Sequence, residues 1–429
     1  MEASFHVVEV DAWLPRAAAA HPRRLAVGSL GYVRLLAEAQ SAARRLASRG
    51  VVAGDRVAIV LPPGEAFATV LHGCLLLGAV AVPLDPRLPE PERALRAGAC
   101  AVLVDGPLQG DEDMAAVLLG RHDLRAPAVV VHTSGTSAGA RPVTLTYGNW
   151  LWSALGSAAA LGLDPEERWL CCLPLAHVGG LSILLRSAIY GTGAIVHERF
   201  DTETVLTALG DAAGPTLVSL VPATLARLLD AGLREPPALR WVLLGGAAIP
   251  PALLERAADA GVPVAPTYGM TEACSQILTN GAPLFCTRVD LSDAGEILVS
   301  GPTVSPDCGR VLHTGDLGRR EAGGTVVVLG RADDVIISGG ENVSPLVVEA
   351  VLEQHPGVAE AAVYARVDEQ WGQAVVAAIV ASRGTRPDEQ EVLDFCRERL
   401  APWEVPKALH VVRELPRTAS GKLLRRALQ

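Results

Sequence analysis

Ala128-Val-Val-Val-His132-Thr-Ser-Gly-Thr-Ser-Ala-Gly-Ala-Arg141 joins a short apolar run to a loop of small and hydroxyl-bearing residues. The run has the length and the β-branched composition of a buried strand. Small residues let backbone N–H groups approach an anion, and the Ser and Thr hydroxyls add donors. The stretch therefore predicts a phosphate-binding loop after a strand, although it lacks the Walker pattern GxxxxGK followed by Ser or Thr. An ordinary Ser/Gly turn would have the same composition.

Similar apolar runs recur on both sides of this stretch, and helical patterns lie between them. The runs cover residues 56–62, 79–83, 128–132, 216–221 and 241–245, and Ala/Leu/Arg-rich helical segments cover 34–49 and 223–231. Alternating strands and helices predict a parallel sheet that is covered on both faces. Ligands of such sheets bind beyond the carboxyl ends of the strands, where the candidate phosphate loop would lie.

The pattern changes near residue 295. Short antiparallel strands are expected at 295–301 and 324–330. A compact α+β pattern follows, with strands expected at 335–337, 359–365, 374–381 and 408–412 and helices at 345–354 and 388–400. The expected fold class is α/β: a large N-terminal domain of layered parallel α/β subdomains with a small β-barrel-like part (1–331), then a small mobile α+β C-terminal domain (332–429).

Composition limits the class of protein. Half of the 429 residues are apolar, and the formal net charge of −10 argues against nonspecific nucleic-acid binding. The first residues include acids and no basic segment, so no secretory signal is expected. No run approaches about 18 uninterrupted apolar residues, so no membrane span is expected. The eight cysteines lack zinc-binding spacing, which fits reduced thiols in a cytoplasmic protein.

Two acidic residues follow strands or tight turns in a way that suits nucleotide chemistry. In Thr267-Tyr-Gly-Met-Thr-Glu272, the Glu272 carboxylate suits Mg²⁺. The alternative is a helix start, with Thr271 as the N-cap and the acidic Glu272 in the first turn. In His313-Thr-Gly-Asp316, the Asp316 carboxylate can accept both hydroxyls of a ribose. An Asx-turn is the alternative for Asp316.

The lysines are few and one of them stands out. The chain has only two lysines, Lys407 and Lys422, against 35 arginines. A lysine offers a compact charge on a flexible stem, whereas arginine offers a rigid fork, so a lysine kept in so arginine-rich a chain is expected to be needed as lysine. Chance retention of Lys422 on a solvated tail is the alternative.

In this order and at these separations, the segments resemble the adenylate-forming superfamily of acyl-CoA synthetases, amino-acid adenylation domains and beetle luciferases. The resemblance covers essentially the whole chain. Gly78-Ala-Val-Ala-Val-Pro-Leu-Asp-Pro86 resembles the family's early strand motif, and Pro416-Arg-Thr-Ala-Ser-Gly-Lys422 resembles its closing motif. Residues 173–191, 268–277 and 337–345 are most similar to the 2-succinylbenzoate–CoA ligases within that family.

The resemblance implies a reaction in two halves. A carboxylate attacks the α-phosphate of ATP, giving an acyl-adenylate and pyrophosphate, and CoA then displaces AMP to form a thioester. The implied cofactors are ATP, Mg²⁺ and CoA as co-substrate, and the implied partners are small molecules, with a homodimer left open. Another aromatic or short-chain carboxylate, a carrier-protein thiol as acceptor, and a catalytically silent nucleotide-binding regulator are the alternatives.

The resemblance also assigns roles at the nucleotide. Lys422 would bridge the substrate carboxylate and the α-phosphate, and Asp333 would be the hinge about which the C-terminal domain turns. Glu272 would hold Mg²⁺ with Thr136 near it, while Asp316 and Arg331 would bind the ribose. The other nucleotide or CoA contacts would come from Thr133, Ser134, Gly135, Thr136, Ser137, Arg141, Gly245, Tyr268, Gly269, Thr271, Gly339 and Gly340.

For the acyl group, the resemblance implies that His177 closes the pocket, with a core histidine bonded to a carbonyl as the alternative. Arg186 is the candidate for a second substrate carboxylate, because an arginine fork suits a carboxylate. A helix-surface position for Arg186 is the alternative, and Ser275 and Gln276 are further candidates for that carboxylate.

The chain departs from the family at three places, one of which is an abbreviated N-terminal region. In the phosphate loop, Ala138 replaces a Gly and Arg141 replaces the Lys, yet the charge is kept, so ATP binding is expected to survive. Six residues separate Pro306 from His313, where relatives carry a longer loop.

Overall fold

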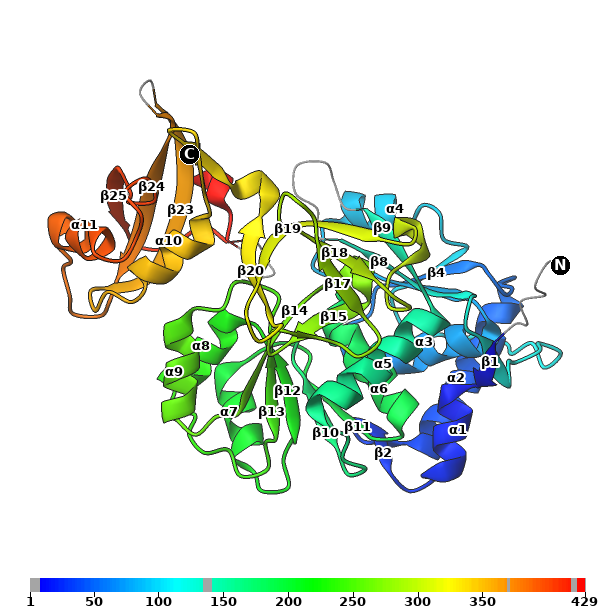
Figure 1. Cartoon of the computed structure of the whole chain (residues 1–429). Coiled ribbons are helices and arrows are strands. Elements are labelled where there is room, and N and C mark those ends of the chain that lie inside the picture. Colours follow the sequence, from blue (N-terminus) through cyan, green and yellow to red (C-terminus); the bar gives the residue numbers. More distant parts are fainter. Residues whose placement is uncertain (1–7, 134–140, 369–370, 418–422, 429) are drawn as a thin grey trace.

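The computed structural model describes residues 8–133, 141–368, 371–417 and 423–428 (Figure 1). A large N-terminal part carries three larger sheets, one two-stranded sheet and most of the helices, and a smaller C-terminal part projects from one side of it. No helix among these residues is long and apolar enough to cross a membrane.

The first sheet of the N-terminal part is mainly parallel. Its order is β6 (Val102–Val104), β4 (Arg56–Ile59), β5 (Val80–Pro83), β8 (Pro127–His132) and β9 (Pro142–Thr146), with β9 antiparallel to β8. The helices near it are α2 (Tyr32–Ser48), α3 (Glu65–Leu77) and α4 (Glu90–Ala97). Strands β4, β5 and β8 confirm the three apolar runs predicted there, and α2 confirms the helix.

The second sheet has nine strands. Its order is β16 (Ala282–Pro283), β15 (Ser275–Thr279), β14 (Val264–Met270), β13 (Trp241–Leu244), β12 (Leu217–Leu220), β10 (Arg168–Cys171), β11 (Gly193–Val196), β2 (Leu25–Val27) and β3 (Leu30–Gly31). The six strands from β14 to β2 are parallel. All four residues of β12 are buried, as expected for a strand covered on both faces.

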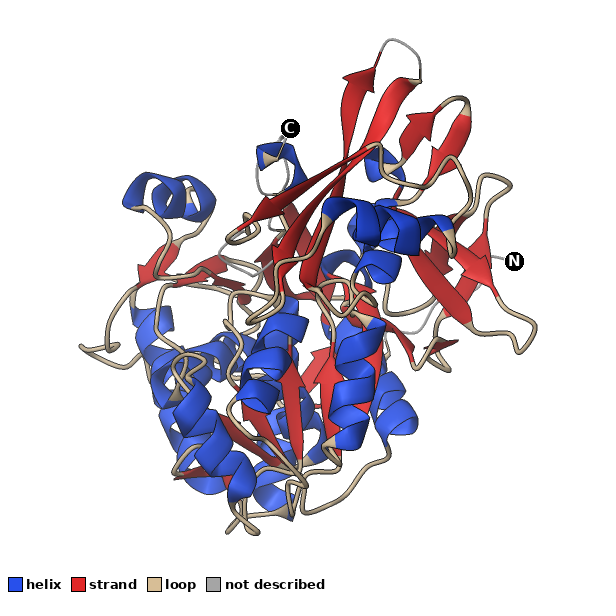
Figure 2. Cartoon of the chain, turned by 90° about the vertical axis from the view of Figure 1, so that its left-hand side faces the viewer, coloured by secondary structure: helices blue, strands red, loops and turns tan. Residues whose placement is uncertain are grey.

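Helices cover the second sheet and join it to the first (Figure 2). They are α1 (Trp13–Ala20), α5 (Tyr147–Leu161), α6 (Val178–Tyr190), α7 (Thr202–Gly210), α8 (Pro222–Asp230) and α9 (Pro251–Asp259). One core cluster contains Val57 from the first sheet, Trp169 from the second, and Leu71 and Leu181 from the helices. The two sheets therefore share one hydrophobic core, which holds their strand ends in a fixed relation.

The third sheet is antiparallel, as the change of pattern near residue 295 predicted. Its order is β17 (Arg288–Leu291), β18 (Glu296–Ser300), β19 (Leu312–Arg320) and β20 (Val326–Arg331). Two short strands elsewhere, β1 (Glu9–Asp11) and β7 (Arg121–Asp123), pair with each other. The 3-10 turns η1 (Thr271–Ala273) and η2 (Pro306–Cys308) lie in the connections.

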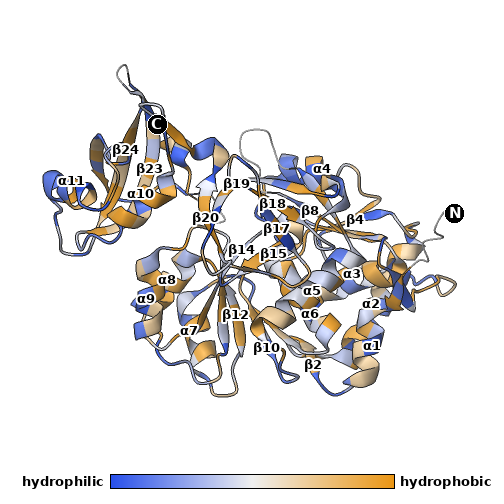
Figure 3. Ribbon diagram, in the orientation of Figure 1, coloured by the Kyte–Doolittle hydropathy of each residue, from blue (hydrophilic) through white to orange (hydrophobic). Residues whose placement is uncertain are grey.

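The C-terminal part has its own sheet and core. The sheet contains β22 (Glu341–Val343), β21 (Ile336–Ser338), β24 (Gly372–Ala381), β23 (Val358–Asp368) and β25 (Ala408–Val412), and the helices are α10 (Pro345–Leu352) and α11 (Glu389–Arg397). In Figure 3, β23 and β24 are largely hydrophobic and α11 carries hydrophilic stretches. All predicted elements of this region are confirmed, and β22 is an additional strand. The 3-10 turns η3 (Ala332–Asp334) and η4 (Arg425–Ala427) lie at its two ends.

Candidate active site

The carboxyl ends of β12, β13 and β14 meet at one edge of the second sheet. Gly245 directly follows β13, and its N–H donates to the carbonyl of Leu220 at 3.1 Å. A Cβ at Gly245 would lie 2.7 Å from both the carbonyl oxygen and the Cγ2 of Thr267. Since backbone cannot yield at that distance, glycine here lets the loop after β13 lie against β14.

A triangle of polar side chains joins this edge to the third sheet. The Tyr268 hydroxyl donates to Asp316 Oδ2 at 2.6 Å, and Arg331 Nη1 lies 3.2 Å from Asp316 Oδ1. Asp316 and Arg331 are paired across β19 and β20. Burial, and then the nearby Asp316 carboxylate, raise the pKa of Tyr268, so the phenol stays protonated and donates.

The backbone around Asp316 decides between its two predicted roles. The Asp316 N–H donates to Thr314 Oγ1 at 3.0 Å, so Thr314 supplies the turn bond. The Asp316 carboxylate is thereby left for Tyr268 and Arg331, and it does not form an Asx-turn. The Asp316 side chain is 10% exposed and that of Arg331 is 52% exposed, so solvent or a ligand can reach the triangle on the Arg331 side.

Glu272 lies in a tight turn between β14 and β15. The pairing of these strands shifts between Tyr268 and Gly269, and a Cβ at Gly269 would lie 1.7 Å from the carbonyl oxygen of Ser275. Met270, and not Thr271, is the N-cap of η1, and Glu272 lies in the first turn. The alternative is therefore wrong for Thr271 and correct for the position of Glu272, which is half-buried at the strand end.

The donor chemistry at Glu272 fits Mg²⁺. Within the described part of the chain, no group of three or more acidic, His or Cys side chains is arranged to hold a metal ion. Mg²⁺ commonly uses one or two carboxylates and completes its shell with waters and substrate phosphates. A single carboxylate such as Glu272 is therefore a suitable protein donor for Mg²⁺ bound to a nucleotide. Thr136, the second predicted metal residue, lies outside the described residues.

The two ends of the candidate phosphate loop are held together. The Thr133 N–H donates to the Arg141 carbonyl at 2.9 Å, and the Arg141 N–H donates to Thr133 Oγ1 at 3.2 Å. Arg141 is exposed. Ser134, Gly135, Thr136, Ser137 and Ala138 lie outside the described residues.

The shortened segment after β18 connects this loop to Glu272. The Ser305 N–H donates to the Glu272 carbonyl at 2.7 Å, and Ser305 Oγ donates to the Thr144 carbonyl at 2.7 Å. The Thr144 N–H donates to Asp307 Oδ2 at 2.7 Å. Strand β9, which returns from the candidate phosphate loop, is thus fixed close to the Glu272 turn. Sequence reasoning missed Ser305 and Asp307, for which no motif gave a signal.

His177 lies after β10 and directly before α6, where it is half-buried. His177 is among the groups that act on Asp85, in the early strand motif. Burial opposes ionisation of Asp85, but hydrogen bonds and charge from Arg87, together with His177, lower its pKa. The early strand motif and the His177 motif, which are far apart in sequence, therefore lie within electrostatic range of each other.

Arg186 is buried, at 1% exposure, so the helix-surface alternative is wrong. Its Nη2 donates to Ser153 Oγ at 3.0 Å, and its guanidinium lies 5.5 Å from the centre of the Trp169 ring. Burial lowers the pKa of Arg186. Among the described residues, Nε and Nη1 have no hydrogen-bond partner. Buried donors of a charged group are costly when unpaired, so an anionic partner would fit here.

Ser153 connects Arg186 to the other acyl-pocket candidates. Ser153 Oγ donates to the Cys274 carbonyl at 2.6 Å, next to Ser275 and Gln276. Gln276 is buried, its Nε2 donates to Thr279 Oγ1 at 2.8 Å, and its Oε1 has no partner among the described residues. The structure thus brings Arg186 to the turn that carries Ser275 and Gln276. Ser153 was not foreseen, since a serine inside an apolar helix gives no pattern.

Gly339 and Gly340 form the turn between β21 and β22. Their φ angles are 62° and 87°, which favour glycine at both positions of a tight hairpin. The Gly339 N–H donates to the Trp371 carbonyl at 2.9 Å, and a Cβ at Gly339 would lie 2.9 Å from the Trp371 ring. Asp333 is exposed in η3. Lys422 lies outside the described residues.

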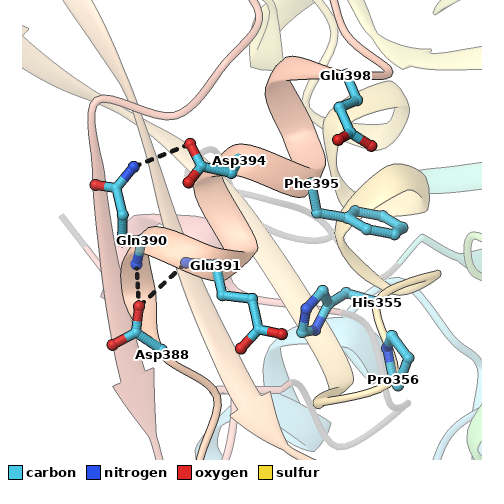
Figure 4. A pocket seen from close by; sticks show the side chains of 8 residues that line it. All are labelled: His355, Pro356, Asp388, Gln390, Glu391, Asp394, Phe395 and Glu398. Carbon is cyan, nitrogen blue, oxygen red and sulfur yellow. Dashed lines mark hydrogen bonds between the residues drawn. The ribbon is translucent and has the colours of Figure 1, made fainter.

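A surface hollow on the C-terminal part has a different character (Figure 4). The Asp388 carboxylate accepts the N–H groups of Gln390 and Glu391 at 3.0 and 3.1 Å and so caps α11. The His355 ring packs edge-on against Phe395, with centroids 5.2 Å apart. These contacts account for the side chains of the hollow as parts of the domain's own packing.

Comparisons with known proteins agree with this geometry. Residues 14–307 match the model of the AMP-binding enzyme family, and residues 347–422 match that of the AMP-binding enzyme C-terminal domain. The 2-succinylbenzoate–CoA ligase of Bacillus licheniformis is 37% identical over 474 aligned positions, which cover 97% of this chain and 98% of the relative. The alignment is longer than this chain, so the relative carries additional residues.

Two solved structures of the o-succinylbenzoate CoA synthetase from Bacillus subtilis are similar throughout. One holds the acyl-adenylate intermediate OSB-AMP, and its TM-score is 0.89 at 34% identity, with 98% of each chain covered. The other holds ATP and a magnesium ion, and its TM-score is also 0.89 at 34% identity, with 98% of this chain and 100% of that chain covered.

Proposed function

The chain belongs to the family of AMP-binding enzymes, and we infer that it is an AMP-forming acid–thiol ligase that converts 2-succinylbenzoate to 2-succinylbenzoyl-CoA. The reaction uses ATP, Mg²⁺ and CoA. Among the described residues, buried Arg186 with two unpaired donor nitrogens supports an acyl substrate that carries a second negative charge. Together with the relatives, this observation favours the aromatic dicarboxylate over a monocarboxylate.

In the first half-reaction, a substrate carboxylate oxygen attacks the α-phosphorus of ATP and pyrophosphate leaves. The Asp316 carboxylate, held between Tyr268 and Arg331, would accept the ribose hydroxyls. The loop from Thr133 to Arg141 would hold the phosphates, and Glu272 would hold Mg²⁺, which neutralises phosphate charge when bound. Lys422 would stabilise the charge that develops between carboxylate and α-phosphate.

In the second half-reaction, the CoA sulfur attacks the acyl carbonyl of the adenylate, and AMP leaves as the thioester forms. The Gly339–Gly340 turn presents no side chain, so the thin pantetheine arm would pass close to backbone there. Residues 332–429 would form the domain that turns about Asp333 between the two steps. The ends of the two family matches, at residues 307 and 347, lie on either side of that boundary.

The acyl group would lie between His177 and the Arg186 turn. One carboxylate is used in the reaction, and the other remains charged. Leaving that charge unpaired in an apolar pocket would cost several kcal/mol. The Arg186 fork would accept it, with Ser275 and Gln276 as the neighbouring polar groups.

The test is CoA-thioester formation with purified protein, ATP and Mg²⁺ across a panel of carboxylates. The panel contains 2-succinylbenzoate, its monocarboxylate analogues, benzoate and short-chain acids. We expect 2-succinylbenzoate to give the highest kcat/KM. A monocarboxylate with a higher kcat/KM would overturn the substrate assignment. Activity only with a carrier-protein thiol would show that this thiol, and not CoA, is the acyl acceptor. Absence of ATP–pyrophosphate exchange with every acid would indicate a nucleotide-binding regulator. A cytoplasmic location and a homodimer stay predictions.

A further inference from the structure

One guanidinium in the C-terminal part holds two carboxylates that lie 76 and 91 positions before it in the sequence. Arg425, in η4, donates from Nε to Glu349 Oε1 at 3.1 Å and from Nη2 to Glu349 Oε2 at 2.7 Å. Its Nη1 donates to Asp334 Oδ2 at 3.2 Å. All three nitrogens of the guanidinium therefore donate hydrogen bonds: two to Glu349 on α10 and one to Asp334 on η3.

The Glu349 end of this arrangement is built into the domain core. Glu349 is buried, and its Oε1 also accepts the Val363 N–H from β23 at 2.7 Å. Burial raises the pKa of Glu349, and Arg425 opposes that change. A buried carboxylate depends on its charged partner, so Arg425 is fixed firmly at this end.

Contacts join the residues on the two sides of positions 418–422, just before Arg425. Arg417 and Leu423 form a β-bridge, and the Leu424 N–H donates to the Pro416 carbonyl at 2.8 Å. Leu423 packs against the cluster that contains Leu415. These contacts hold both flanks of residues 418–422 on the C-terminal part, and Arg425 stands three positions after Lys422.

The other arm of Arg425 reaches the proposed hinge. Asp334 immediately follows Asp333, and its side chain is 38% exposed, whereas that of Arg425 is 19% exposed. With Asp334 bound to Arg425, the backbone after Asp333 is joined to the same body as the tail. Free rotation is then confined to the residues before Asp334.

We propose that Arg425 is a positioning residue, which ties the tail that carries Lys422 to the first residue after the hinge so that both turn as one body. The proposal rests on the proposed function, in which Lys422 acts in adenylation only. A lysine at position 425 would not serve, because a single ammonium cannot present three donors in one plane.

The main test compares the two half-reactions in Arg425→Gln. We expect the kcat of ATP–pyrophosphate exchange to fall by about 10²-fold, since a displacement of about 1 Å at a reacting group can cost that much. KM for ATP and thioester formation from supplied acyl-adenylate should stay within about threefold of wild type, the range of ordinary context effects. A merely structural role predicts equal losses in both half-reactions, and that result would overturn the proposal.

Two further variants keep the test decisive if Arg425→Gln is unstable. Arg425→Gln combined with Glu349→Gln removes the buried charge together with its partner, which can be nearly neutral for folding. The double variant should fold and still lose adenylation, whereas wild-type adenylation in it would overturn the proposal. Arg397→Gln removes a surface pair with Asp394 on α11 and serves as the matched control, with both half-reactions unchanged.

A readout independent of any acyl substrate is available because the chain has two lysines. A protease that cleaves only after lysine reports on Lys422, with Lys407 as the internal reference. Arg425→Gln should speed cleavage after Lys422 without changing that after Lys407, and equal rates would contradict the proposal. Wild-type protein that shows no exchange with 2-succinylbenzoate would refute the proposed function, whereas the cleavage result would stand by itself.

Discussion

The triangle of Tyr268, Asp316 and Arg331 and the lysine-bearing tail are built in contrasting ways. Asp316 and Arg331 are paired across β19 and β20, and Tyr268 reaches Asp316 from β14 of the second sheet. The tail and the hinge lie on the short turns η4 and η3, and one arginine fork joins them. We therefore expect changes in the first region to act on substrate binding, and changes in the second to act on one half-reaction.

Arg186, like the triangle, is held by packed helices and strands, and its replacement should show the largest effect. Arg186→Ala is expected to raise KM for 2-succinylbenzoate by an amount equivalent to about 2–5 kcal/mol, because a charge-paired partner is lost. KM for ATP and for CoA should change little. Steady-state kinetics with each substrate varied in turn measures this.

A monocarboxylate analogue is the control for Arg186→Ala, and its KM should be indifferent to the change. An unchanged KM for 2-succinylbenzoate would mean that Ser275, Gln276 or backbone amides hold the second carboxylate. Arg186 would then be a buried structural cation paired with Ser153.

Asp316→Asn tests the triangle of Tyr268, Asp316 and Arg331. Asparagine keeps an acceptor for the Tyr268 hydroxyl but loses the charge that faces Arg331 and that would accept the ribose hydroxyls. Hydrogen bonds to charged groups contribute about 1.5–3 kcal/mol, so KM for ATP should rise roughly 10- to 150-fold. KM for 2-succinylbenzoate should stay near wild type, and a rise in both constants would show that Asp316 shapes the whole edge instead.

Asp333→Pro tests the second region. Proline fixes φ and would freeze the proposed hinge. Thioester formation should fall by at least about tenfold, equivalent to about 1.4 kcal/mol, while adenylation persists. Stopped-flow assays of the separate half-reactions measure this, and wild-type rates in both would place the pivot elsewhere.

Glu353→Gln is expected to have the smallest effect on catalysis, because it acts on the stability of the fold. Burial raises the pKa of Glu353 from 4.5 to about 7, with Glu349 and Glu360 adding to the rise. The folded state thus holds this proton more tightly than the unfolded state, so stability falls as pH rises from about 4.5 to about 7.

The glutamine side chain of this variant cannot ionise, so the variant should not lose folding stability as the pH rises. We expect Glu353→Gln to raise the free energy of unfolding by up to about 3 kcal/mol at pH 8 and to change it little at pH 4.5. Denaturant titrations at the two pH values measure the difference. Exposed Glu389→Gln is the control, and equal shifts at both pH values would contradict the account.

Much of the fold could be predicted because its signals are local. The buried run that became β12 and the amphipathic pattern that became α2 each follow from a few neighbouring residues. Strand β22 was missed because it is three residues long and follows a glycine pair that indicated a loop.

Site residues could be predicted where they belong to a sequence motif. They could not be predicted where only the packing of distant elements brings them to the site. Tyr268 and Asp316 are 48 positions apart, so no local sequence pattern could predict the hydrogen bond between them. Ser153 and Arg425 carry no pattern of their own, since one is a small residue inside an apolar helix and the other is one of 35 arginines. Such contacts depend on the three-dimensional packing of distant elements.

Lys422→Ala, assayed in both half-reactions, tests most directly whether the two regions serve separate steps. We predict that 2-succinylbenzoate-dependent ATP–pyrophosphate exchange falls by about 10²–10³-fold, the usual loss for one charge-stabilising donor. Supplied acyl-adenylate should still react with CoA at the wild-type rate. Equal losses in both half-reactions would contradict the assignment of Lys422 to adenylation alone.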